Sequence, residues 1–291
     1  MVENTVDGKF FVTARGWEDL SEILKSYEEL QVEIGEELIG EFLQKEEIAR
    51  DFAGYYRLYE KYKSDYQIQE ILDGNVTTRQ LKTCCDMGKK ASFEERFTVT
   101  EMLLEAVTER ISVFQKIDEK TEKLYENLKL LKIFLQEKNS VEAMEQFIVS
   151  RRKALDAKIC SELLTAEEAA REEEQIRILE EYFFQLKELH ISGVTEGIEQ
   201  IVERFGNVCR LRNEKLEETK KMLEHAFSFL EECFGEGQEL LLFETGLTGD
   251  DRCSIFISQY GCPSYFKHCE LLLYSKKENE LRKECRDLLE E

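Results

Sequence analysis

The hydrophobic pattern begins with a stripe in residues 13–30, where apolar side chains recur every three or four positions. This spacing puts them on one face of a helix. Thr13 stands just before the stripe and can cap the helix by accepting a hydrogen bond from a backbone N–H. The same period continues through residues 36–72, with many tyrosines and phenylalanines. The first 75 residues therefore predict three or four short helices around one aromatic-rich core.

A longer apolar stripe follows over residues 97–136. It is sustained over many turns, with Glu and Lys between its members. Such a stripe predicts one long amphipathic helix. Further helices are predicted over 141–164, over 165–189 and over 198–234. The helix over 165–189 should open with a capping box, since Thr165 is followed by Glu168 at the third helical position. Short breaks between long helices favour antiparallel neighbours, so an antiparallel bundle or coiled coil is expected.

The remaining segments divide the chain. Residues 73–92 are rich in glycine, asparagine and serine and are typical of a connector, although Thr78 to Cys85 could form a helical turn. We therefore expect a helical head at 1–75, a linker at 76–96, a helical bundle at 97–236 and a C-terminal segment at 237–291 that packs back on the head or the bundle. That last segment is expected to be mixed, because Leu240 to Phe243 could form a strand. With one proline in 291 residues, the fold class is all-α.

The composition of the chain limits the kinds of partner that it is expected to bind. The chain has 62 acidic and 40 basic side chains, a formal charge of -22. This charge repels phosphate backbones and anionic lipids, so neither nucleic acid nor a membrane is an expected partner. The longest apolar runs are far shorter than the roughly 20 residues that cross a bilayer. Nine cysteines, an odd number, without an apolar leader indicate reduced thiols and a cytoplasmic location.

Motifs for chemistry are missing from the sequence. A phosphate-binding P-loop requires G-x-x-x-x-G-K-[ST], which the chain does not contain, so hydrolysis of a nucleotide by this chain alone is not expected. His190 and His225 have no nucleophile at a recognisable spacing. Cys84 and Cys85 are adjacent, but redox use requires a lowered pKa that a sequence does not show. We predict neither catalytic nor metal-binding residues; the nearest zinc candidates, whose spacing matches no common zinc site, are Cys253, Cys262, His268 and Cys269.

Two stretches carry a resemblance to a known family. The sequences "FFVTARGWEDLSEIL" and "EELIGEFLQKEEIARDFAGYYRLYEKY" resemble the helical lid of AAA+ ATPases of the MoxR type. In that family a Ser/Thr-Pro-Arg segment opens a lid helix, and its arginine, the sensor 2 residue, reaches the nucleotide phosphates. Thr13-Ala14-Arg15 matches this segment, with Ala14 where the family often has proline. The resemblance implies that Arg15, with Thr13 beside it, contacts the cofactor.

The resemblance covers residues 9–75 and, more weakly, 240–285, where "FISQYGCPSYFKHCELLLY" is similar to the closing segment of large MoxR-like proteins. It implies a lid and a helical extension without the P-loop core, so the chain is expected to be a portion of a longer protein. ATP and Mg²⁺ would bind only with that core. The implied partners are the AAA+ core module, homologous subunits and proteins with von Willebrand factor A domains, and the implied role is chaperone-like remodelling coupled to nucleotide state.

Two other interpretations stay open. The chain could be a stand-alone acidic helical scaffold, since long amphipathic helices with Glu and Lys flanks bind other helices without any nucleotide. An enzyme acting through helix-borne carboxylates has less support, because these glutamates have no histidine or metal ligand at a suitable spacing. Arg15 itself has an ordinary alternative, a surface ion pair with Glu18 or Asp19.

Overall fold

The computed structural model describes residues 2–5, 8–135, 139–191 and 193–273, and side chains only between residues 12 and 268. Almost all of these residues are helical, which confirms the all-α fold class. A short antiparallel hairpin precedes the helices: strand β1 (Val2–Thr5) pairs with β2 (Gly8–Phe11), with Val2 opposite Phe11. The chain folds as two compact units, Met1–Leu103 with Phe229–Phe243, and Leu104–Ser228 with Glu244–Glu291.

The first unit contains the predicted short helices. These are α1 (Ala14–Glu29), α2 (Glu36–Phe42), α3 (Glu46–Tyr66) and α4 (Ile68–Asp73). The apolar faces of α1, α2 and α3 meet in one core, as the helical spacing predicts, while α4 buries Ile68, Ile71 and Leu72 outside that core. The buried members of that core are Leu20, Leu24, Ile39, Leu43, Ala49, Ala53 and Tyr56.

The first unit also contains a helix where a linker was expected. Residues 76–96 include α5 (Thr78–Gly88), and α6 already begins at Phe93. The start of α5 is fixed by a capping box, in which Thr77 accepts from the backbone N–H of Gln80 and the Gln80 side chain accepts from the backbone N–H of Thr77. Its buried face consists of Cys84, Cys85 and Gly88. Small buried residues and polar caps resemble loop composition, which explains the difference from the expected connector.

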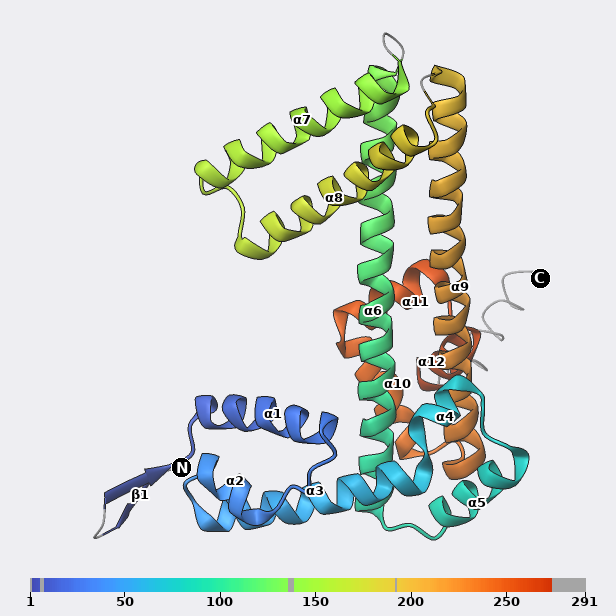
Figure 1. Ribbon diagram of the computed structural model, residues 1–291. Helices are drawn as coiled ribbons and strands as arrows, with labels where there is room; N and C mark the ends of the chain where they lie inside the picture. Colours follow the sequence, from blue (N-terminus) through green and yellow to red (C-terminus); the bar gives the residue numbers. More distant parts are fainter. Residues whose placement is uncertain (1, 6–7, 136–138, 192, 274–291) are drawn as a thin grey trace, which may run out of the picture. The chain divides into compact units, whose positions relative to one another are not determined.

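Four long helices are present where the periodicity predicts them. They are α6 (Phe93–Phe134), α7 (Ser140–Cys160), α8 (Ala166–Glu188) and α9 (Val194–Phe234). The second unit holds all of α7 and α8, which are joined by a short turn and lie side by side (Figure 1). Its core combines apolar side chains of all four helices, among them Leu131, Phe147, Leu179 and Ile201. The predicted capping box of Thr165 and Glu168 is confirmed.

The described part of the C-terminal segment is helical rather than mixed. It contains α10 (Gln238–Gly249), α11 (Asp251–Tyr260) and α12 (Pro263–Leu273). Leu240 to Phe243, which could have been a strand, therefore belongs to α10. Leu240, Phe243 and Leu247 are all buried at helical spacing. A short apolar run does not distinguish a strand from a buried helix by its period, and here burial on one helical face decides.

Candidate functional site

The predicted cofactor residues lie at the first turn of α1. Thr13 is the N-cap, with extended backbone angles, and its hydroxyl oxygen accepts a hydrogen bond from the backbone N–H of Gly16 at 2.9 Å. The Thr13 hydroxyl therefore already has a structural role in starting the helix. A Cβ added to Gly16 would lie 2.9 Å from the backbone oxygen of Phe42, so a glycine is needed where α1 approaches the end of α2.

Arg15 extends into solvent from that turn. Its side chain is 87% exposed, and its Nε lies 3.8 Å from Oδ2 of Asp19, one turn further along α1. An ion pair this exposed contributes under about 1 kcal/mol. The guanidinium can therefore exchange Asp19 for an anion that it binds more strongly, at little cost in free energy. Together with the helix N-terminus it supplies positive charge suited to a phosphate oxygen.

A row of aromatic side chains lies in the same unit. Trp17 of α1 meets Phe52 of α3 edge to face at 5.1 Å between ring centroids, Phe52 lies 6.3 Å from Tyr55, and Tyr55 lies 6.4 Å from Tyr59. Trp17 is 39% and Tyr55 51% exposed. The row joins α1 to α3 and leaves aromatic surface accessible, which is common at protein interfaces.

The first unit also has a cavity of about 610 Å³ between the end of α1, the following loop and α3. Tyr56 lines it and donates a hydrogen bond to Glu28 Oε1 at 2.9 Å. Burial, and then this bond to Glu28, raise the pKa of Tyr56 above its usual range. Lys63 is within 3.7 Å of Glu28 and 3.3 Å of Glu60. Because glutamates outnumber cations in its lining, the cavity is not suited to a phosphate group.

In the second unit, Asp118 of α6, Arg212 of α9 and Tyr260 of α11 form a closed polar network. Arg212 Nε donates to Asp118 Oδ1 at 2.7 Å, and Arg212 Nη2 donates to the Tyr260 oxygen at 2.8 Å. Tyr260 in turn donates to Asp118 Oδ2 at 2.6 Å. Burial, followed by the bond to Asp118, raises the pKa of Tyr260 to about 12. No local pattern in the sequence indicates this network, because its members are up to 142 residues apart.

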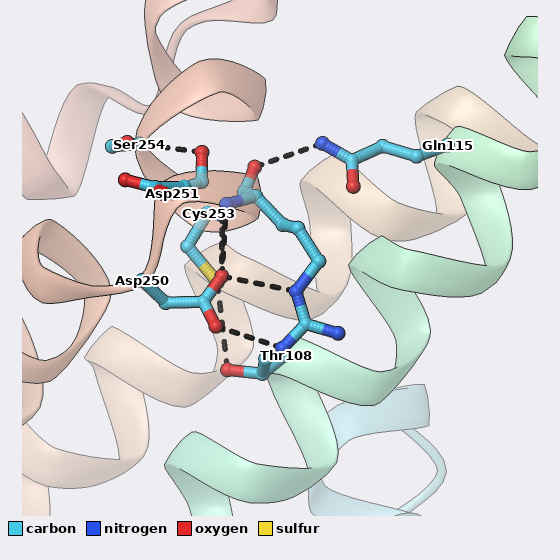
Figure 2. A network of polar contacts seen from close by, with 7 residues as sticks. Thr108, Gln115, Asp250, Asp251, Cys253 and Ser254 are labelled. Carbon is cyan, nitrogen blue, oxygen red and sulfur yellow. Dashed lines mark hydrogen bonds and ion pairs between the residues drawn. The ribbon is translucent and has the colours of Figure 1, made fainter.

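A second polar network surrounds the start of α11 (Figure 2). Asp250 caps the helix by accepting from the backbone N–H groups of Arg252 and Cys253, and it also accepts from the Arg252 guanidinium at 2.8 Å. The hydrogen bond from Arg252 is the main cause that lowers the pKa of Asp250. Gln115 of α6 donates to the backbone oxygen of Arg252 at 2.9 Å. These contacts anchor a helix terminus and present no group poised for proton transfer.

The cysteines considered as zinc ligands are buried thiols with other partners. Cys253 lies 3.4 Å from the Thr108 hydroxyl, and Cys262 donates to Glu224 at 3.4 Å. Burial raises their pKa values to about 11 and about 12. Among the residues that the structure describes, no three Cys, His, Asp or Glu side chains are arranged to hold a metal ion. The side chain of Cys269 lies outside the described residues.

Comparison with protein-family models, with curated proteins and with solved structures found no match to this chain. Within the described helices, none combines the length and the apolar character needed to span a bilayer. The candidate site is therefore defined by its own residues: Arg15 at the start of α1, with the exposed aromatic row of Trp17 and Tyr55 in the same unit.

Proposed function

We propose that this chain is the lid and helical extension of a MoxR-type AAA+ ATPase and does not hydrolyse ATP by itself. In this proposal Arg15 reaches the phosphates of a nucleotide that is bound by a separate P-loop core. That core supplies the site for ATP and Mg²⁺. The helical extension then carries the resulting movement to a client or partner, such as a homologous subunit or a protein with a von Willebrand factor A domain.

The observation that carries the proposal is the placement of Arg15. It is 87% exposed on the first turn of a helix whose opposite face is packed, with Leu20 and Leu24 in the core of the unit. The helix that presents the guanidinium is thus anchored, while among the described side chains the guanidinium is paired with Asp19 alone, through a weak ion pair. An anchored helix with an exposed, weakly paired cation at its N-terminus suits a residue that contacts a phosphate bound by another domain.

A second support is that the segment carrying the resemblance folds as one piece. Helices α1 to α3 share a single apolar core, and α4 belongs to the same compact unit. If residues 9–75 had formed no compact unit, the lid interpretation would have lost its basis. The acidic cavity in this unit does not compete for the nucleotide, since its lining repels phosphate.

The test is nucleotide hydrolysis by this chain, alone and after addition of the matching P-loop core. We expect no turnover by the chain alone, turnover when the core is added, and a loss of at least about tenfold on Arg15→Ala, in line with the loss of one charge-assisted contact to phosphate. Arg50→Ala is the matched control, because Arg50 is also exposed in the first unit. Equal turnover of the two variants would remove Arg15 from the mechanism.

One observation favours the second candidate, an acidic helical scaffold with no nucleotide role. Helices α7 and α8 and the turn between them expose large apolar side chains, with Leu163 of the turn at 72%, Phe184 of α8 at 59% and Ile159 of α7 at 48%. Apolar side chains along exposed helices are a common means of binding another helix. The same assay separates the candidates, because a scaffold leaves the turnover of an added core unchanged.

A further inference from the structure

The last turn of α9 and helix α5 pack closely within the first unit. The buried face of α5 is formed by small residues, Cys84, Cys85 and Gly88. A Cβ added to Gly88 would lie 2.8 Å from Cε1 of Phe234, so the absence of a side chain there lets the two helices approach. Cys233, the neighbour of Phe234, is buried at 2% exposure.

Three buried thiols lie at this contact, two on α5 and one on α9. Cys85, at 6% exposure, lies on the same buried face of α5 as Gly88, and Gly88 approaches Phe234, the residue next to Cys233. Cys84 is directed elsewhere, since its Sγ donates to the backbone oxygens of Asp65 and Tyr66, each at 3.8 Å. Consecutive residues of a helix also point about 100° apart, which separates the side chains of Cys84 and Cys85.

We propose that Cys85 and Cys233 form a reversible disulfide that fastens α5 to α9. A disulfide requires two Cβ atoms directed at each other from backbones that lie close together. The contact of Gly88 with Phe234 brings the two backbones close together, and Cys85 and Cys233 are the thiols at this contact that donate to no backbone oxygen among the described residues, unlike Cys84. This inference is independent of the proposed nucleotide role.

The oxidant is a low-molecular-weight disulfide of the oxidised glutathione class. The Cys85 thiolate attacks one sulfur of that disulfide, forms a mixed disulfide and releases one small thiolate. The Cys233 thiolate then attacks the Cys85 sulfur and releases the second. Both small thiolates take up the protons that the two protein thiols lose. One protein disulfide is formed and one small disulfide is reduced to two thiols.

Burial determines when the reaction occurs. It is the main cause that raises the pKa of Cys233, and it also raises the pKa of Cys84. Since only a thiolate attacks a disulfide, the folded first unit resists oxidation until the contact between α5 and α9 opens. The reduced form therefore persists under brief exposure to an oxidant, and the cross-link accumulates only under sustained oxidising conditions.

The test uses the full chain, reduced and then equilibrated with mixtures of reduced and oxidised glutathione. After denaturation and alkylation of the remaining thiols, peptide mapping identifies the linked cysteines. We expect the peptide of Cys85 joined to that of Cys233, and a Tm several degrees higher in the oxidised chain, because a cross-link over a long loop destabilises the unfolded state.

Single variants give the matched controls. Cys84→Ser should still form the cross-link, whereas Cys85→Ser and Cys233→Ser should not. The mapping of the unmodified chain decides the result even if a variant fails to fold. Oxidation of the exposed Cys160 without any linkage of Cys85 to Cys233 at any glutathione ratio would overturn the proposal, and so would a cross-link that depends on Cys84.

Discussion

The polar network of the second unit offers a quantitative test of what holds that unit together. Asp118→Ala removes the carboxylate that accepts from both Arg212 and Tyr260. The Asp118 side chain is 27% exposed and that of Arg212 is 21% exposed, so the remaining guanidinium would be mostly buried without its counter-ion. The variant should therefore lose much more stability than a surface ion pair provides.

The loss in the free energy of unfolding on Asp118→Ala lies between two limits. Breaking a fully buried pair costs about 3–5 kcal/mol, and an exposed pair contributes under about 1 kcal/mol. With roughly three quarters of both side chains buried, we expect about 2–3 kcal/mol for Asp118→Ala. Tyr260→Phe loses two hydrogen bonds but keeps its ring 5.5 Å from Phe114, so about 1–2 kcal/mol is expected.

The assay is urea unfolding followed by far-UV circular dichroism and by tryptophan fluorescence. Trp17 is the single tryptophan and belongs to the first unit, so its fluorescence reports that unit, whereas the dichroism reports both. Asp118→Ala should shift the dichroism transition most. Asp19→Ala, which breaks the exposed pair with Arg15, is the control and should change little.

A double variant isolates the pair. Asp118→Ala combined with Arg212→Ala should cost less than the sum of the two single changes, by about 1–2 kcal/mol, because the second change no longer leaves a buried charge unpaired. Additive costs, or a loss below about 0.5 kcal/mol for Asp118→Ala, would refute the reasoning that burial makes this ion pair important.

Three further predictions concern the second unit. Gly197→Ala should destabilise it by about 1–3 kcal/mol in urea unfolding, because the added Cβ would collide with the buried Ser140 side chain of α7. Thr165→Ala should cost about 1 kcal/mol in the same assay through loss of the cap on α8. Tyr182 is buried and its hydroxyl has no hydrogen-bond partner among the described residues, so Tyr182→Phe should leave stability at neutral pH unchanged or higher. Burial raises the pKa of Tyr182 to about 12 from an ordinary value of 10.0. The contribution of the neutral tyrosine to the free energy of unfolding is therefore fully present below pH 10 and is lost as the pH rises to about 12. Over this range the free energy of unfolding should decline less in Tyr182→Phe than in the unmodified chain.

Local signals in the sequence predicted the parts of the fold that depend on near neighbours. The capping box of Thr165 and Glu168 and the cap by Thr13 were predicted correctly, because each is decided within four residues. The long helices followed from apolar spacing, which reflects a single face. Their observed bounds differ from the predicted ones by a few residues, as at α9, which begins at Val194 rather than 198.

The features that the sequence did not predict depend on distant partners. The sequence of helix α5 was interpreted as a linker. Its buried face consists of two cysteines and a glycine, and these small residues form a packing surface because Phe234 lies against them. The network of Asp118, Arg212 and Tyr260 joins three helices, and nothing in the local pattern of any one of them indicates it. Tertiary contacts of this kind override local composition.

The buried thiols and Arg15 differ in their accessibility in the intact fold. Burial raises the pKa of the thiols of Cys84, Cys233, Cys253 and Cys262, which keeps them protonated and poorly nucleophilic. Arg15, in contrast, is exposed and only weakly paired. Helices α6, α9 and α10 each contribute residues to both units, so under the proposal a ligand that fixes Arg15 acts on a unit that is covalently continuous with the other through three helices. If phosphate binding at Arg15 changes the conformation of the unit that carries it, those three helices are the elements through which the second unit would respond.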